Sequence, residues 1–235
     1  MIRLFRKVRN QLLSEGKYSI YILYASGEVF LVMIGILLAL QIDNWNDHHK
    51  TQKELSEIFD EIHDDLVLDT TSVSRILTER ILDNQAQERI IFAIQNDLSF
   101  SDQIQNDLGR LMLKRSVPLV SSGFNLLKES KLISIDDKIL RTALIEYYEQ
   151  VVIRMKDEFQ EDGYEFETVW LPYVRHNFIE WKFGNYGVPV DWESMKDDPN
   201  FRITLQMNLN NLNMTILEMQ NGLSSATYIL ELLDQ

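Results

Sequence analysis

The feature that most constrains this chain is an apolar stretch of 25 residues near its N-terminus, from Tyr18 to Ile42. Glu28 is the only acidic or basic side chain inside it. A bilayer core of about 30 Å requires roughly 20 apolar residues in a helix, so the stretch is long enough to cross a membrane once. A cleaved signal peptide explains it less well, because Leu37 stands where cleavage after Ala39 requires a small residue. A buried core helix would leave the flanking charges unexplained.

Charge differs on the two sides of this stretch. Residues 1–17 carry five basic side chains and one acidic one, whereas Asp43 and Asp47 follow the stretch and the whole chain has a net charge of −13. Basic residues stay on the cytoplasmic side of a membrane. We therefore expect a cytoplasmic basic amphipathic segment at 1–17, a transmembrane helix at 18–42 and an extracytoplasmic domain at 43–235. The expected location is a bacterial inner membrane, with this domain in the periplasm and the lipid bilayer as a partner.

The composition excludes several function classes. A strongly acidic chain lacks the basic face that binds nucleic acid, so we expect no nucleic-acid partner. The absence of cysteine excludes disulfides, thiolate metal ligands and a cysteine nucleophile. The sequence also has no P-loop, nucleophile elbow or dinucleotide-binding glycine motif. We therefore expect no enzyme activity, no catalytic residues, no cofactor and no metal.

The densest group of ionisable residues is DEIHDD at 60–65. Asp60 and His63 are three residues apart, as in carboxylate-bridged metal sites, but no other histidine has an acidic residue three positions before it. We interpret this run as a solvated acidic helix face. A membrane-tethered metal hydrolase around His63 is a distant alternative.

The domain after the apolar stretch is expected to be all-α, because 235 residues contain only nine glycines and four prolines. Leu55, Phe59, Ile62, Leu66, Val73 and Ile76 follow helical spacing, with Asp69 interrupting the row. Ser101 is expected to cap a short helix reaching Arg115. A further helix is expected to start at Ser134 or Asp136 and to end at Gly163.

The C-terminal helix has the strongest pattern. Asp198 is a good N-cap and Pro199 a good first helical residue. An apolar seam follows at spacings of four and three, through Leu205, Leu209, Leu212, Ile216, Met219, Leu223, Ala226, Leu230 and Leu233. The seam predicts either an antiparallel bundle with the first long helix of the same chain or a coiled coil between chains.

An irregular, aromatic-rich insert is expected at about 163–199, before this helix. Residues 163–201 contain ten aromatic side chains and several prolines and glycines. Clustered tryptophan and tyrosine are typical of binding surfaces, so the candidate partner-binding residues are Trp170, Trp181, Tyr186 and Trp192. The alternative interpretation is a hydrophobic cap on the open end of the bundle.

A second candidate site lies inside the membrane stretch. Glu28, Gly35 and Ala39 are separated by seven and four residues and share one helix face. Gly35 and Ala39 form a pair of small residues that lets two helices approach closely, which predicts a homo-oligomeric interface. A carboxylate within a span is costly, so Glu28 is either functional there or extends to the cytoplasmic headgroups.

The sequence around the stretch also carries a family resemblance. Residues 27–47, GEVFLVMIGILLALQIDNWND, follow a basic segment, RLFRKVRNQLLSEGKY, at 3–18. The matching residues are Gly27, Glu28, Ile34, Gly35, Ile36, Leu37, Ala39, Leu40, Gln41, Asn44, Trp45 and Asn46, while Asp43 replaces a frequent asparagine. This pattern resembles the N-terminal signature of a domain-of-unknown-function family of single-pass membrane proteins common in Bacteroidota. The resemblance covers about the first fifth of the chain and implies an anchored inner-membrane protein with a helical domain.

Taken together, these features predict a membrane-anchored envelope interaction, scaffold or sensory module without enzymatic activity, which acts through a protein partner or as a homo-oligomer. The alternative is an oligomeric transmembrane component that uses Glu28 for proton or ion handling.

Overall fold

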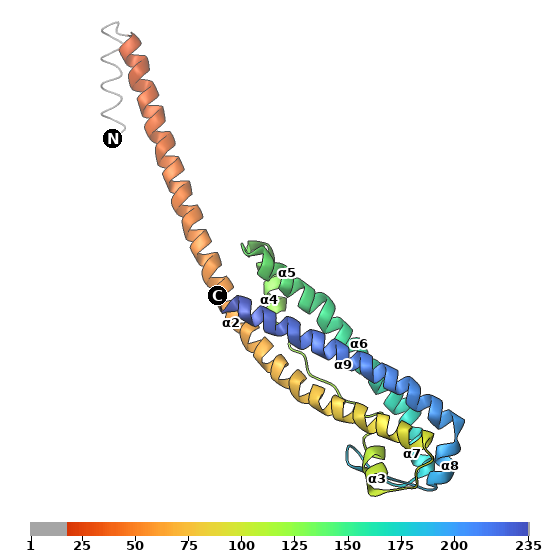
Figure 1. The fold of residues 1–235 in the computed structure, drawn as a ribbon. Helices are drawn as coiled ribbons and strands as arrows, with labels where there is room; N and C mark the ends of the chain where they lie inside the picture. The colour runs from red at the N-terminus through yellow and green to blue at the C-terminus, as the bar shows by residue number, and fades with distance from the viewer. Residues whose placement is uncertain (1–17, 235) are drawn as a thin grey trace. The chain divides into compact units, whose positions relative to one another are not determined.

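The computed structural model describes residues 18–234 and divides into two compact units, Met1–Glu54 and Leu55–Gln235. The protein is mainly helical, with one small two-stranded sheet among the described residues (Figure 1). The helices are α2 (Tyr18–Gln95), α3 (Asp102–Leu108), α4 (Ser122–Ser130), α5 (Lys138–Glu146), α6 (Val152–Glu165), α7 (Leu171–Asn177), α8 (Trp192–Asp197) and α9 (Pro199–Leu233). A short 3-10 turn, η1 (Leu132–Ser134), and two π-helical turns, η2 (Tyr147–Val151) and η3 (Phe166–Trp170), lie between them. The predicted basic segment 1–17 lies outside the described residues.

The N-terminal unit contributes the apolar part of α2. Within residues 18–234, one helix is long and apolar enough to cross a membrane, judged by length and composition. None of the residues in its most apolar 18-residue window is buried. Glu28, Gly35 and Ala39 are exposed on this helix, and no atom lies within 4 Å of the position that a Cβ would take at Gly35. An apolar helix without protein packing is what a lipid-facing segment requires.

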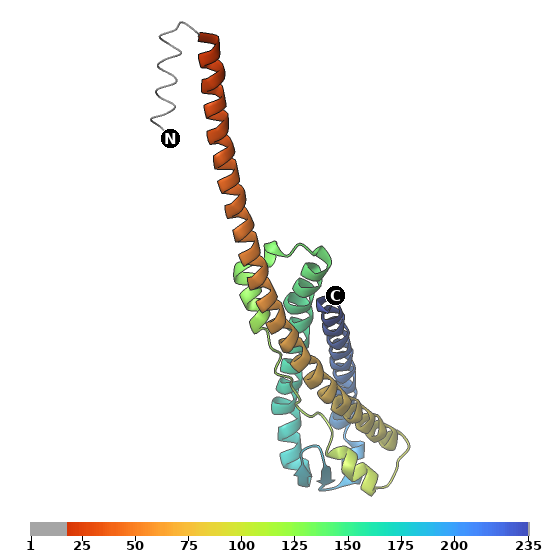
Figure 2. The same cartoon turned by 90° about the vertical axis from the view of Figure 1, so that its left-hand side faces the viewer.

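In the second unit, α2 from Leu55 onward and the helical segment α5–α7 run in the same direction. Two side-chain contacts establish this: Asp69 accepts a hydrogen bond from Tyr147, and Arg80 forms an ion pair with Asp162 further along both elements. After a turn at 109–112, an extended segment at 113–121 carries the chain back between them, as Figure 2 shows. A crossover of this kind is what parallel neighbouring helices need.

Helix α9 runs antiparallel to both of these elements. Near its start, the Leu205 carbonyl accepts a hydrogen bond from Gln87 of α2 at 2.9 Å. Further along α9, Asn213 accepts a bond from Asn84 at 2.8 Å, so the residue numbers on α2 decrease as those on α9 increase. In this unit α2 and the segment α5–α7 are therefore parallel, and α9 is antiparallel to both.

Buried carboxylates of α2 hold the end of the extended segment. Asp69 accepts a hydrogen bond from the Val120 backbone N–H at 2.9 Å, and Asp65 accepts one from the Gly123 N–H at 3.0 Å. Val120 lies in non-helical backbone and Gly123 in the first turn of α4, so neither N–H group has an acceptor within a helix. The expected solvated acidic face at 60–65 is therefore wrong for Asp65, which is buried, and Asp69 belongs to the buried row that it was expected to interrupt.

The expected helix end at Gly163 is also wrong. The backbone remains helical from Lys138 through two π-helical turns to Asn177. A glycine ends a helix by adopting a positive φ, and among the described residues Gly184 is the only glycine with one. The region expected to be irregular from residue 163 is thus helical as far as Asn177.

A hairpin and a short helix complete the expected insert. Strand β1 (Phe178–Lys182) pairs antiparallel with β2 (Tyr186–Pro189), and Gly184 has a φ of 67° in the turn between them. Asp198 then caps α9 by accepting a hydrogen bond from the Asn200 N–H, with Pro199 as the first helical residue. This start of α9 confirms the sequence prediction, as does the Ser101 cap, although α3 ends at Leu108 rather than near Arg115.

The buried face of α9 is rotated relative to the predicted seam. Leu205, Leu212, Met219 and Ala226 are buried as expected, but Leu209, Ile216, Leu223, Leu230 and Leu233 are only half-buried. Asn208, Thr215, Gly222 and Ile229 occupy the inward positions instead. Gly222 explains part of this rotation, because a Cβ there would lie 2.4 Å from the Met155 sulfur. The glycine lets α9 approach α6 closely.

The interior has three parts. The long-helix cluster is the mainly aliphatic core that includes Ile62, Leu66, Leu144, Met155 and Met219. The aromatic cluster is the core around Ile90, Leu108, Trp170, Trp192 and Phe201. Buried polar residues separate these two clusters along α2, α6 and α9, and we call them the polar layer. They are Arg80, Asp83, Asn84 and Gln87 of α2, Asp162 of α6, and Asn208 and Thr215 of α9.

Candidate functional site

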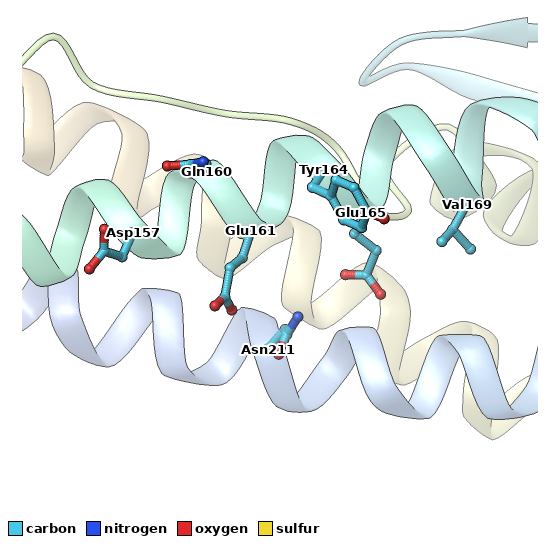
Figure 3. A pocket seen from close by; sticks show the side chains of 7 residues that line it. All are labelled: Asp157, Gln160, Glu161, Tyr164, Glu165, Val169 and Asn211. Carbon is cyan, nitrogen blue, oxygen red and sulfur yellow. The ribbon is translucent and has the colours of Figure 1, made fainter.

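A groove of about 790 Å³ lies between α6 and α9. It is lined by Asp157, Gln160, Glu161, Tyr164, Glu165, Val169 and Asn211 (Figure 3). We call it the acidic groove. It belongs entirely to the second unit and adjoins the polar layer.

Helical spacing creates the row of carboxylates in this groove. Asp157, Glu161 and Glu165 are each four residues apart on α6, so they share one face. In Figure 3 the side chains of Glu161 and Glu165 point from α6 towards α9, where Asn211 faces them. The π-helical turn η3 begins directly after Glu165 and carries Val169 to the end of the groove. Such turns occur frequently at functional sites.

The groove has an excess of negative charge. Glu165 accepts a hydrogen bond from Asn208, whereas Asp157 and Glu161 have no cationic partner among residues 18–234. Burial raises the pKa of the neighbouring Glu158, and the Glu161 carboxylate raises it further. Carboxylates at this spacing lower the free energy of a cation that binds between them.

A buried ion pair lies behind the groove. Arg80 and Asp162 are in direct contact and are almost fully buried. Arg80 also donates to the Leu113 carbonyl at 2.6 Å, while the Thr215 hydroxyl donates to Glu158 at 3.3 Å. Burial raises the pKa of the Asp162 carboxyl and lowers that of Arg80, and each charge opposes the shift of the other. The contacts connect α2, the extended segment and α6 at one level of the polar layer.

One polar atom beside the groove lacks a partner. The Asn208 side chain is 4 % exposed, and its Nδ2 donates to Glu165 at 2.5 Å. Its Oδ1 is buried and accepts no hydrogen bond within the described chain. A buried acceptor without a donor costs about 1–3 kcal/mol. The carboxylates that line the groove suit a ligand that carries positive charge and N–H donors, such as a lysine or arginine side chain.

The four predicted partner-binding aromatics have different environments. Trp170 and Trp192 are buried in the aromatic cluster, and the Trp192 ring nitrogen donates to the Leu98 carbonyl at 2.9 Å. Their side chains are part of the core in this structure. Trp181 and Tyr186 are half-buried on the hairpin, so only these two still offer surface to a partner.

The histidine considered for metal binding has few neighbours. His63 lies 3.6 Å from Asp64 and 3.9 Å from Asp234, measured between ring nitrogens and carboxylate oxygens. Across residues 18–234, no group of three or more acidic or histidine side chains is arranged to hold a metal ion. The acidic groove was not among the sites expected from the sequence. The signal that predicts it is the four-residue spacing of Asp157, Glu161 and Glu165.

No family model matches the chain, and searches of curated proteins and of solved structures found no match either. The residues and their geometry are therefore the basis for a functional proposal.

Proposed function

We propose that the protein is a membrane-anchored, non-enzymatic interaction module whose outer unit binds a cationic segment of a partner protein in the acidic groove. The observation that carries the proposal is the row formed by Asp157, Glu161 and Glu165, none of which has a cationic partner within residues 18–234. The Asn208 amide that donates to Glu165 is neutral, so it leaves the negative charge of the row uncompensated. Recognition of basic residues by carboxylates gives specificity and fast association.

The anchor in this proposal is the apolar part of α2. Its exposed apolar surface supports insertion, and the basic residues at 1–17 support a cytoplasmic N-terminus with the second unit in the periplasm. The resemblance of residues 27–47 to a Bacteroidota membrane-protein family agrees with an inner-membrane location. The outer unit then acts as a helical bundle that presents α6 and α9 to the envelope.

Reporter fusions test the orientation. A reporter fused after Lys50 and another fused to the C-terminus should both be active only outside the cytoplasm. Reporters active only in the cytoplasm at both positions would contradict the orientation and remove the periplasmic partner.

A charge-neutral variant tests the groove. We expect a partner that co-purifies with the wild type from native membranes to be lost from the triple variant Asp157→Asn, Glu161→Gln and Glu165→Gln. A matched control neutralises three exposed carboxylates outside the groove, Glu129→Gln, Asp136→Asn and Glu146→Gln, and should retain the partner. Equal recovery with both variants would contradict the groove as the binding surface.

A second candidate function is an oligomeric transmembrane component that uses Glu28 for proton or ion handling. The face shared by Glu28, Gly35 and Ala39, with small residues at 35 and 39, favours it. Crosslinking through single cysteines at Val32, Gly35 and Ala39 should then concentrate at 35 and 39. A phenotype that depends on the proton gradient should be lost in Glu28→Gln, and equal crosslinking at all three positions would remove this candidate.

A further inference from the structure

Helix α9 contains almost no charge. Between Ile203 and Leu230, 28 residues include one charged side chain, Glu218, whereas seven of the 14 residues in α6 are charged. Glu218 is itself paired with Arg154, at 3.1 Å. A helix with one buried face normally carries charged residues on the opposite face. The outer face of α9 therefore departs from the pattern of a solvent-facing helix.

Apolar side chains follow this outer face at regular spacing. Ile203, Met207, Met214, Leu217 and Tyr228 are 46–61 % exposed. With Asn210, Asn221 and Ser224 they form a second row at alternating spacings of four and three, opposite the buried face of α9. We call this row the outer stripe. Sustained spacing of this kind is the pattern of a helix that packs against another helix.

We propose that the outer stripe is a self-association surface, on which α9 of a second copy of this chain packs in parallel. Two copies with a net charge of −13 repel each other over most of their surface. The outer stripe is a region where they meet without that repulsion. The positions that flank it on one side, Gln206, Asn213, Gln220 and Thr227, are also uncharged. A basic partner would gain nothing from this face, and so a second copy suits it better.

The polar residue Asn221 supports the parallel arrangement. It follows Met207 and Met214 at seven-residue intervals, in the position of the repeat where asparagine pairs with its own copy and fixes the register of parallel dimers. Two chains anchored in one membrane through equivalent helices also point the same way. This second argument rests on the proposed anchor, whereas the neutral stripe does not.

The size of the stripe predicts a weak contact. At 1.5 Å per residue, 28 residues extend roughly 42 Å, and a face about 10 Å wide buries roughly 400 Å² per copy. A stable complex usually buries about 800 Å² per partner. The association therefore depends on the membrane, which raises the effective concentration of tethered copies.

Cysteine crosslinking of the full chain in membranes tests the proposal, because the native sequence has no cysteine. Met207→Cys and Met214→Cys should each form disulfide-linked dimers several-fold faster than the control Ile139→Cys, an exposed apolar position on α5. Adding Leu217→Lys to Met207→Cys should suppress the dimer, whereas adding Ile139→Lys should not. Intrinsic tryptophan fluorescence checks that each variant is folded.

Three outcomes would overturn the proposal: equal crosslinking at 139 and 214, no crosslinking at 207 and 214, or no effect of Leu217→Lys. An environment-sensitive dye can be attached to Met214→Cys. If it reports an apolar environment while no dimer forms, the outer stripe contacts lipid rather than a second copy. Carbonate extraction tests the anchor separately. A chain that leaves the membrane fraction refutes the anchor, and crosslinking at high protein concentration then still tests the stripe.

Discussion

The long-helix cluster and the aromatic cluster are both hydrophobic cores, but they are built from different side chains and different elements. The long-helix cluster is assembled from aliphatic residues at helical spacing on α2, α5–α6 and α9. The aromatic cluster joins the ends of α2 and α9 to several short elements. Its rings stack on each other, with centroids 5.7 Å apart for Trp170 and Tyr173 and 5.3 Å apart for Tyr173 and Phe201. Large rings bury enough area to hold a hairpin and two short helices that have little hydrophobic surface of their own.

The polar layer separates these two cores. Without it, α9 would present an unbroken apolar face and could shift along α6 by one turn at little cost. Specific pairs such as Arg80 with Asp162 and Asn84 with Asn213 favour one register. The comparison indicates that apolar packing supplies stability at both ends while the polar contacts select the alignment.

The largest expected effect is in the polar layer. Arg80→Met should destabilise the protein by about 5 kcal/mol, because it leaves the Asp162 charge buried without a partner. Chemical denaturation of the detergent-solubilised chain, followed by tryptophan fluorescence, measures the change. Arg154→Met, which breaks the more exposed pair with Glu218, is the control and should cost about 0–1 kcal/mol. Equal losses for the two variants would contradict a structural role for the layer.

The next effect concerns the aromatic cluster. Trp170→Ala should cost about 4 kcal/mol, since the ring is fully buried and its loss leaves a large cavity. Trp181→Ala, on the half-buried hairpin, should cost clearly less in the same denaturation experiment. A larger loss for Trp181 would mean that the hairpin, rather than Trp170, organises this end of the unit.

A third prediction separates the two sides of the predicted seam on α9. Leu212→Ala should cost about 3 kcal/mol because Leu212 is buried, whereas Leu223→Ala should cost about 1 kcal/mol because Leu223 is half-buried. Thermal melting of both variants measures the difference. Equal losses of stability for the two variants would support the seam predicted from the sequence and contradict the rotated buried face.

The smallest effect is a pH dependence. Burial raises the pKa of Asp69 to about 6, against the opposing hydrogen bonds from Val120 and Tyr147. The folded state therefore binds a proton more tightly than the unfolded state, so acidification from pH 7 to pH 5 should stabilise the wild type by about 1 kcal/mol relative to Asp69→Asn. The asparagine retains an acceptor for Val120. The same change in the free energy of unfolding between pH 7 and pH 5 for both proteins would contradict the raised pKa of Asp69.

Several parts of the fold could be predicted from the sequence because their signals are local. The apolar stretch at 18–42, the N-cap of α9 at Asp198 and the cap at Ser101 each depend on a few neighbouring residues. The extended crossover at 113–121 could not be predicted, because a segment without alternating apolar and polar residues has no periodicity. Its partners Asp65 and Asp69 looked like ordinary surface carboxylates.

The predictability of the candidate sites follows the same rule. The acidic groove has a local signal on α6, but only the packing of α9 shows that Glu161 and Glu165 face a second helix. The aromatic residues were recognised as a group, yet sequence alone did not separate the buried Trp170 from the half-buried Trp181. That separation depends on η3 and on the hairpin, which are set by tertiary contacts.

The crossover also determines when the interior can form during synthesis. Arg80 must wait for Asp162, which is 82 residues further along the chain, and Thr215 is made later still. At about 5–20 residues per second, roughly 4–16 s pass before the ribosome has added the first of these partners. Throughout that interval α2 exposes Arg80, which is buried in the folded protein, and the apolar residues on both sides of it. The nascent chain therefore remains dependent on a late C-terminal helix, and a translation product that stops before α9 would retain an open core.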